Sequence, residues 1–184
     1  DMGGELNGVL SMDNTNTLAY KNSVSGVNFS VDFNADNGSD GSSKSIGLDY
    51  APMDGMMVFY GQSDIAAGTN DTDSHTTFGG TYTTMGATVG LQMTSIDDAT
   101  ANSDIDRTHI AASFAVNENL SVSYGMSTVE FEAASKSDQE DSGFGASYTM
   151  GSMTFGASML ASDNVGGTSG SDDTHKEVSV AFAF

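Results

Sequence analysis

The fold is decided by the stretch GATVGLQMTSI, residues 86–96. Along it the large side chains Val89, Leu91 and Met93 alternate with glycine, threonine or glutamine. A period of two places alternate residues on opposite faces of a β-strand. Ten further stretches read as strands, although the phase of 55–64 is ambiguous because 56–60 is continuously apolar. The clearer copies are 27–34, 120–127, 143–150 and 177–184, and the weaker ones are 18–21, 46–50, 76–82, 107–116 and 153–161.

The amino-acid composition excludes several classes of protein. The 184 residues include 25 Asp and Glu against 5 Lys and Arg, a net charge of −20, and no Cys. Without cysteine there is neither a disulfide nor a thiolate metal site, and five cations are too few for a phosphate-binding face, so no nucleic-acid partner is expected. No run of 18 apolar residues suggests a transmembrane helix.

Short and long connections alternate strictly along the chain. Tight turns are predicted at 23–26, 52–55, 84–86, 117–119 and 150–152, and long polar loops at 36–43, 65–74, 97–106, 133–141 and 163–173. In an up-and-down meander alternate connections lie at opposite ends, so one end carries only tight turns. Outer-membrane barrels have this asymmetry, whereas a Greek-key sandwich has no reason for it.

Residue choice indicates which face meets water. The polar face is rich in Gly, Ser and Thr and poor in the Lys and Glu of soluble sheets, and aromatic residues such as Tyr20, Tyr60, Tyr82 and Tyr148 recur near strand ends. We therefore predict an all-β protein, an antiparallel up-and-down transmembrane β-barrel with short periplasmic turns and long extracellular loops. The alternative is a soluble acidic β-protein of a halophile, with the apolar face as its core.

Two stretches resemble the general, non-specific porins of Gram-negative bacteria, of the alphaproteobacterial type. One is LAYKNS at 18–23, followed by GVNFSV at 26–31, and the other is the terminal strand that ends at Phe184. The resemblance implies an integral protein of the outer membrane, a homotrimer in contact with membrane lipid. It also implies that Val178, Val180, Phe182 and Phe184 form the signal read by the outer-membrane assembly machinery.

The resemblance also implies a place in a larger barrel. In the family the LAYKNS-like strand is about the sixth of sixteen, so residues 17–184 would be the last eleven antiparallel strands. Residues 1–16 would be the tail of the pore-constricting loop, with Asp1, Glu5 and Asp13 adding negative field. The alternative is that residues 4–12 form a strand and the chain is a complete 12-stranded barrel.

Alternation selects six charged or titratable residues for the inner face. Rings of Asp and Glu in a pore favour cations, and Lys and Arg favour anions. Lys21 and Arg107 are the only basic candidates in this set. The predicted pore-lining residues are Lys21, Asp32, Asp49, Arg107, His109 and Glu177.

Other chemistries have weaker support. His109 shares a strand face with Ser113, but serine and aspartate are so abundant that such a pairing is expected by chance, and no enzyme is predicted. Asp36 and Asp40 begin a Ca²⁺-loop-like stretch whose twelfth position is Gly47 rather than an acid, so no cofactor is assigned. Paired loop aspartates could bridge through divalent ions to lipopolysaccharide.

The predicted function is passive diffusion of small hydrophilic solutes and ions through a water-filled channel with a weak preference for cations. A non-pore outer-membrane barrel, such as a 12-stranded enzyme or adhesin, is the alternative within the same fold.

Overall fold

The structure is a computed structural model that describes residues 17–35, 41–66 and 72–183. These form one sheet of eleven strands, in agreement with the prediction. The strands are β1 (Thr17–Val24), β2 (Val27–Asn34), β3 (Ser43–Met53), β4 (Met56–Ala66), β5 (Thr72–Thr84), β6 (Ala87–Asp97), β7 (Ile105–Ala115), β8 (Leu120–Phe131), β9 (Gln139–Met150), β10 (Met153–Asp163) and β11 (Asp173–Phe182).

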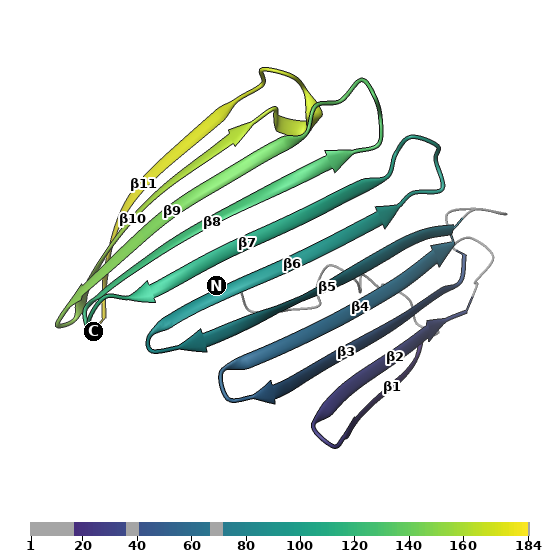
Figure 1. The fold of residues 1–184 in the computed structure, drawn as a ribbon, viewed down its shortest axis with the longest axis horizontal. Helices are drawn as coiled ribbons and strands as arrows, with labels where there is room; N and C mark the ends of the chain where they lie inside the picture. Colours follow the sequence, from purple (N-terminus) through teal and green to yellow (C-terminus); the bar gives the residue numbers. More distant parts are fainter. Residues whose placement is uncertain (1–16, 36–40, 67–71, 184) are drawn as a thin grey trace.

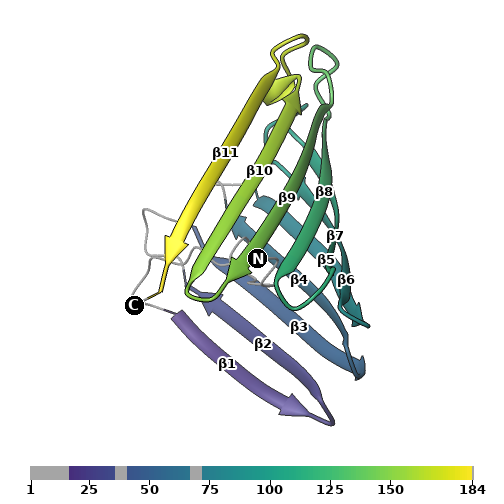
Figure 2. The same ribbon diagram turned by 90° about the vertical axis from the view of Figure 1, so that its left-hand side faces the viewer.

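Each strand pairs antiparallel with the next, from β1 to β11 in sequence order. The sheet is a single curved layer, and seen from its β11 side it forms an open trough (Figures 1 and 2). Strands β1 and β11 are its two edges and do not pair with each other. Within the described residues the only helical element is the short 3-10 turn η1 (Val165–Gly167), and no helix there is long and apolar enough to cross a bilayer.

The connections follow the predicted parity. Hairpins join β1 to β2, β3 to β4, β5 to β6, β7 to β8 and β9 to β10 at one end, and the remaining connections lie at the other (Figure 1). Ser25 and Gly26 have φ of 53° and 82°, and Met85 and Gly86 have 49° and 80°, which are the paired positive values that type I′ hairpins require. Several strands run beyond their predicted limits at the loop end, because backbone pairing continues after the apolar alternation has stopped.

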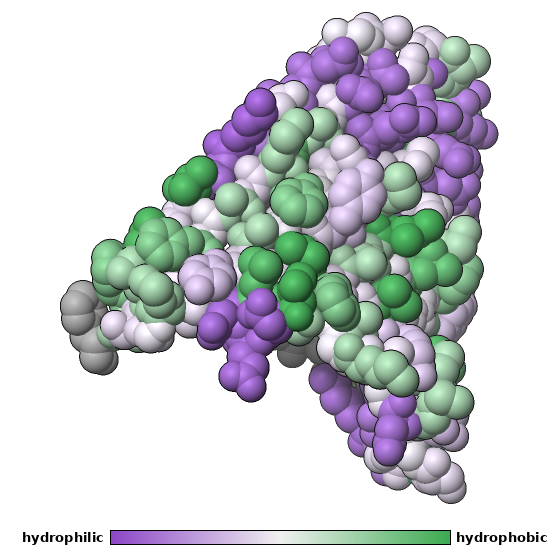
Figure 3. Space-filling view, turned by 60° about the vertical axis from the view of Figure 1, so that its left-hand side comes forward, coloured by the Kyte–Doolittle hydropathy of each residue, from purple (hydrophilic) through white to green (hydrophobic). Residues whose placement is uncertain are grey.

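The two faces differ in the way that a membrane sheet requires. Only Val129 is a buried hydrophobic residue in the described part, while five polar residues of the inner face are buried: Asp32, Asn34, Ser45, Ser63 and Thr77. The large apolar side chains of the alternating stretches point outward and stay exposed, among them Val89 (52%) and Phe182 (57%). In Figure 3 hydrophobic residues form a zone below the hydrophilic end of the molecule. This sheet has no shared dry interior, so the soluble alternative is wrong.

The ambiguous strand β4 has a definite phase in the structure. Register pairs Gly61 with Gly47 and Thr77 of the inner face, so Phe59 also points inward and Tyr60 outward. The inner face is therefore not lined by small residues alone. Ile105, Val129, Phe131 and Leu160 share it with glycine and serine.

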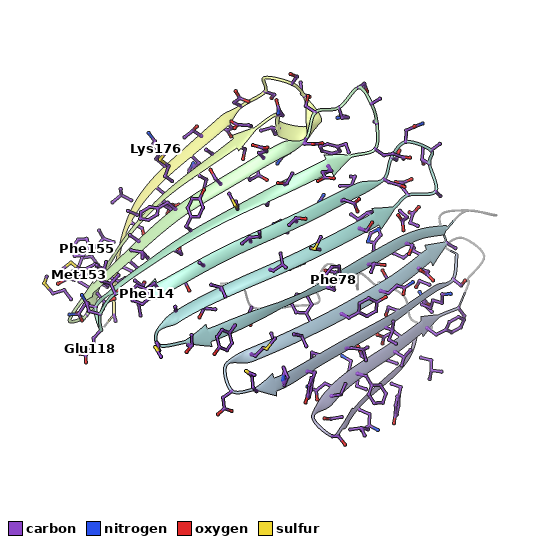
Figure 4. All side chains as sticks on the ribbon, viewed as in Figure 1. Phe78, Phe114, Glu118, Met153, Phe155 and Lys176 are labelled. Atoms are coloured by element: carbon purple, nitrogen blue, oxygen red, sulfur yellow. The ribbon has the colours of Figure 1, made fainter. Side chains whose placement is uncertain are left out.

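Aromatic and charged residues mark the two borders of the outer face. Phe114, Met153 and Phe155 gather near the tight-turn end, with Glu118 beyond them, whereas Lys176 lies farther toward the loops (Figure 4). A lysine near the edge of an apolar zone can extend its ammonium group to the water interface.

Candidate functional site

All six residues predicted to line a pore lie on the inner face. Their positions follow from the strand register, which links Lys21 to Ser30, Asp32 to Ser45 and Asp49 to Asn28 in the first three strands. Register likewise connects Arg107 to Thr94 and Glu177 to Ser158, both on the same face.

On β2 and β3 the inner carboxylates are held by neutral donors. The Ser45 hydroxyl donates to Asp32 over 3.3 Å, and the Asn28 amide donates to Asp49 over 2.7 Å. Asp32 is only 6% exposed, so its charge is the most shielded of the set. Lys21 remains exposed and forms no ion pair with any residue that the structure describes.

The second basic position is six strands away on β7. Arg107 and His109 point inward two residues apart, opposite Val129 and Ser127 of β8. Arg107 is exposed and His109 half-buried. The structure therefore does not gather Lys21 and Arg107 into one basic cluster. No hydrogen bond between His109 and Ser113 is present in this described region, which leaves no nucleophile–base pair there.

Three inner carboxylates were not predicted from the sequence. Asp141 pairs with Ser127 and Ser162, Asp173 pairs with Ser162, and Asp73 pairs with Ile65, all on the inner face. All three were assigned to loops because no apolar alternation surrounds them, although the strands begin at Gln139, Asp173 and Thr72. Asp141 could have been found by extending the alternation of its strand backwards. It is an even number of residues from Gly143, Gly145 and Ser147 and therefore shares their face.

The complete inner set is more acidic than predicted. Six carboxylates face two cations on the described strands, where the sequence indicated three against two. The carboxylates are Asp32, Asp49, Asp73, Asp141, Asp173 and Glu177, and the cations are Lys21 and Arg107. Lys44 and Lys176 point outward, and Lys44 pairs there with Asp64 at 3.0 Å.

The inner face is hollowed over β7 to β11. One hollow of about 490 Å³ is lined by His109, Ser127, Asp141, Leu160 and Ser162 among others. A second, also about 490 Å³, lies nearer the tight turns and includes Glu177 in its lining. Glycines on β8 to β10 leave this room, since their positions carry no side chain.

At the loop end, carboxylates satisfy backbone groups. Thr100 N–H donates to Asp98 over 2.7 Å, and Asp98 N–H donates to Asp104 over 2.9 Å. Asp98 accepts hydrogen bonds from the backbone N–H and from the hydroxyl of Thr100. These bonds lower the pKa of Asp98 below the ordinary value of an aspartate. The loop carboxylate is therefore ionised at neutral pH and adds to the negative field at this end.

The one loop lysine, Lys136, ties two loops together. Its ammonium donates to the Gly166 carbonyl and lies 5.4 Å from the centre of the Phe131 ring. Beside it, Ser137 N–H donates to the Gly167 carbonyl over 3.0 Å. These contacts, which we call the loop latch, join the β8–β9 and β10–β11 connections.

Replacing Lys136 with alanine is expected to loosen the loop latch. The loss of one cation–π contact and one hydrogen bond is worth about 1 kcal/mol at an exposed site, or about fivefold in local opening. Limited proteolysis of the two loops in detergent measures this, with Lys176→Ala as the control for loss of a lysine outside the latch. Equal cleavage rates for the two variants would contradict the latch.

Several predicted residues lie outside the described part of the chain: Asp1, Glu5, Asp13, Asp36, Asp40 and Phe184. The constriction-loop and Ca²⁺ predictions thus remain untested. Within the described ranges, no group of three or more His, Asp or Glu residues could hold a metal ion.

Comparison with known proteins agrees with this geometry. The family model for Gram-negative porins matches residues 2–154. The chain belongs to the Gram-negative porin family. The family and the fold are those of outer-membrane β-barrel channel proteins and not of an enzyme. No curated protein sequence gives a match.

Solved structures similar to this porin share its fold at low sequence identity. They include the anion-selective porin of Comamonas acidovorans, with a TM-score of 0.69 at 13% identity. A triple mutant of the Rhodopseudomonas blastica porin gives 0.62 at 20%, and OmpF of Salmonella typhi in complex with daunomycin gives 0.69 at 15%. The matches cover 91, 91 and 90% of this porin but only 59, 55 and 61% of those chains. The chain thus spans a little more than half of the length of these porins.

Proposed function

We propose that this porin forms part of the wall of a water-filled channel for passive diffusion of small hydrophilic solutes and ions across the outer membrane. The single observation that carries the proposal is the division of the curved sheet into a polar inner face and an exposed apolar outer face. In lipid such a sheet exposes its apolar face to acyl chains and encloses water on the other.

The open edges support completion of the barrel by further strands. Bilayer hydrocarbon cannot satisfy the free N–H and C=O groups of β1 and β11, so the sheet must close. We propose that these are the last eleven of sixteen strands, consistent with coverage of 55–61% of the similar porins. Residues 1–16 would then be the tail of the pore-constricting loop.

The charge of the inner face favours a weak preference for cations. Carboxylates outnumber cations six to two on the described strands, and a positively charged ion gains from that field. The Comamonas porin is described as anion-selective. Sharing a fold does not fix selectivity, because the sign depends on lumen side chains that differ at 13% identity.

The proposed partners follow from the outer face. Membrane lipid would cover the apolar zone, and a second and third copy would complete a homotrimer. At the loop end Asp106 opposes Glu130 and Glu140 opposes Asp163 on the outer face. Such like-charge pairs are unfavourable unless they are solvated or bridged by divalent cations, which could link them to lipopolysaccharide phosphates. The residues Val178, Val180, Phe182 and Phe184 would serve the outer-membrane assembly machinery.

The test is conductance of the purified full-length protein in planar bilayers. Stepwise openings are expected, with a reversal potential in a KCl gradient that shows a modest excess of K⁺ over Cl⁻ permeability. Swelling of proteoliposomes in small sugars checks the passage of neutral solutes. A folded protein that inserts but gives neither current nor swelling would be a filled barrel, and the proposal would fail.

A further inference from the structure

We propose that Asp141 is the cation-attracting site of this part of the channel wall and the residue here with the largest influence on ion selectivity. The inference rests on the proposed channel function and names the side chain that would produce its cation preference.

The carboxylate of Asp141 is fixed in place by neutral donors. The Ser127 hydroxyl donates to it over 3.0 Å, and the Gln139 amide donates to its two oxygens over 3.0 and 3.1 Å. Ser162 lies directly opposite on β10. These groups orient the carboxylate without neutralising it, so its charge is available to an ion in the channel.

No lysine or arginine lies on the strands next to Asp141. On the same row of the inner face, the order from β7 to β11 is His109, Ser127, Asp141, Ser162, Asp173. The nearest permanent cation in register is Arg107, two strands away on β7 and in the neighbouring row. The outer-face Asp64 differs, since Lys44 pairs with it at 3.0 Å.

The space beside Asp141 allows close approach by a hydrated ion. It lines the hollow of about 490 Å³, whose walls include Gly143 and Gly145. Two of the other inner carboxylates are less available to a passing ion. Asp32 is only 6% exposed, and Glu177 has His175 at 3.8 Å.

The test compares two neighbours on one strand. Asp141→Asn and Glu140→Gln each remove one negative charge, but Asp141 points inward and Glu140 outward. The reversal potential across a tenfold KCl gradient near 0.1 M gives the permeability ratio. Asp141→Asn is expected to lower the K⁺/Cl⁻ ratio about two- to threefold, the effect of one screened charge about 6 Å from a passing ion. Glu140→Gln is expected to leave it unchanged.

A second variant keeps the inference testable if Asp141→Asn does not fold. Ser127→Lys keeps Asp141 and places a cation directly opposite it, whereas Asp173 pairs with Ser162 on the other side, and we expect a similar loss of K⁺ preference. An unchanged K⁺/Cl⁻ permeability ratio in Asp141→Asn would overturn the inference but leave the proposed channel intact. An equal change of this ratio in Glu140→Gln would do the same. The absence of any current from the wild-type protein would instead remove the proposed function.

Discussion

Lysine in place of Val122 is expected to destabilise the folded porin in lipid by about 1–3 kcal/mol, because it puts a charge on the lipid-facing surface within the apolar zone, on its tight-turn side. Val122 lies between Leu120 and Tyr124 on the outer face of β8 and pairs with Phe114 and Ala146. The ammonium would have no polar partner at that depth. Guanidinium unfolding in liposomes measures the loss of folding free energy.

The matched control is Ser123→Lys, one residue along the same strand. Ser123 points inward, opposite Ser113 and Gly145, where a lysine side chain reaches the water of the lumen. We expect a change of less than about 1 kcal/mol, in line with substitutions at a solvated surface. Equal costs at the two positions would mean that the assignment of the faces is wrong.

Alanine in place of Gly79 is expected to cost about 1–3 kcal/mol, because the added methyl group has no room. A Cβ there would overlap the carbonyl oxygen of Leu91 on the adjacent strand and approach the Phe59 ring to 2.7 Å. The ring of Phe59 covers this glycine from the neighbouring strand, an arrangement that stabilises glycine in sheets. Thermal unfolding followed by heat-modifiable migration in detergent gels reports the loss.

Gly125→Ala provides the comparison. Gly125 also lies on the inner face, but the nearest atoms to a Cβ there are the Cβ of Ala111 at 3.4 Å and the carbonyl oxygen of Ile110 at 3.6 Å. We expect stability within about 0.5 kcal/mol of wild type, since a small gain in backbone rigidity offsets a slight crowding. A larger loss at Gly125 than at Gly79 would contradict the close packing seen around Phe59.

The strands and their order could be predicted because each residue of a membrane sheet faces either lipid or water, and its own polarity indicates which. The alternation at 86–96 indicates a strand with one apolar and one polar face, and no other strand is needed to see it. The length of each connection indicates at which end of the sheet it lies. All eleven strands and the five-and-five parity of the connections were confirmed. The phase of β4 was not predictable, because Met56 to Tyr60 is apolar on both faces.

The candidate site was only partly predictable. Lys21, Asp32, Asp49, Arg107, His109 and Glu177 were placed on the inner face by alternation alone, and the register agrees. Asp141 was not found, since it lies where the strand rises above the apolar zone and both faces carry polar residues. Its strand membership depends on backbone pairing with Ser127 and Ser162, which are far away in sequence.

Local alternation was enough to predict the strand count, the order of short and long connections and, except in β4, which side chains share a face, because each of these depends on neighbouring residues alone. Which inner carboxylates share a hollow and which have a cation nearby became clear from the folded sheet, because electric fields depend on distances between strands. The folded sheet also shows that Lys44 and Lys176 point outward, which leaves six inner carboxylates against two cations.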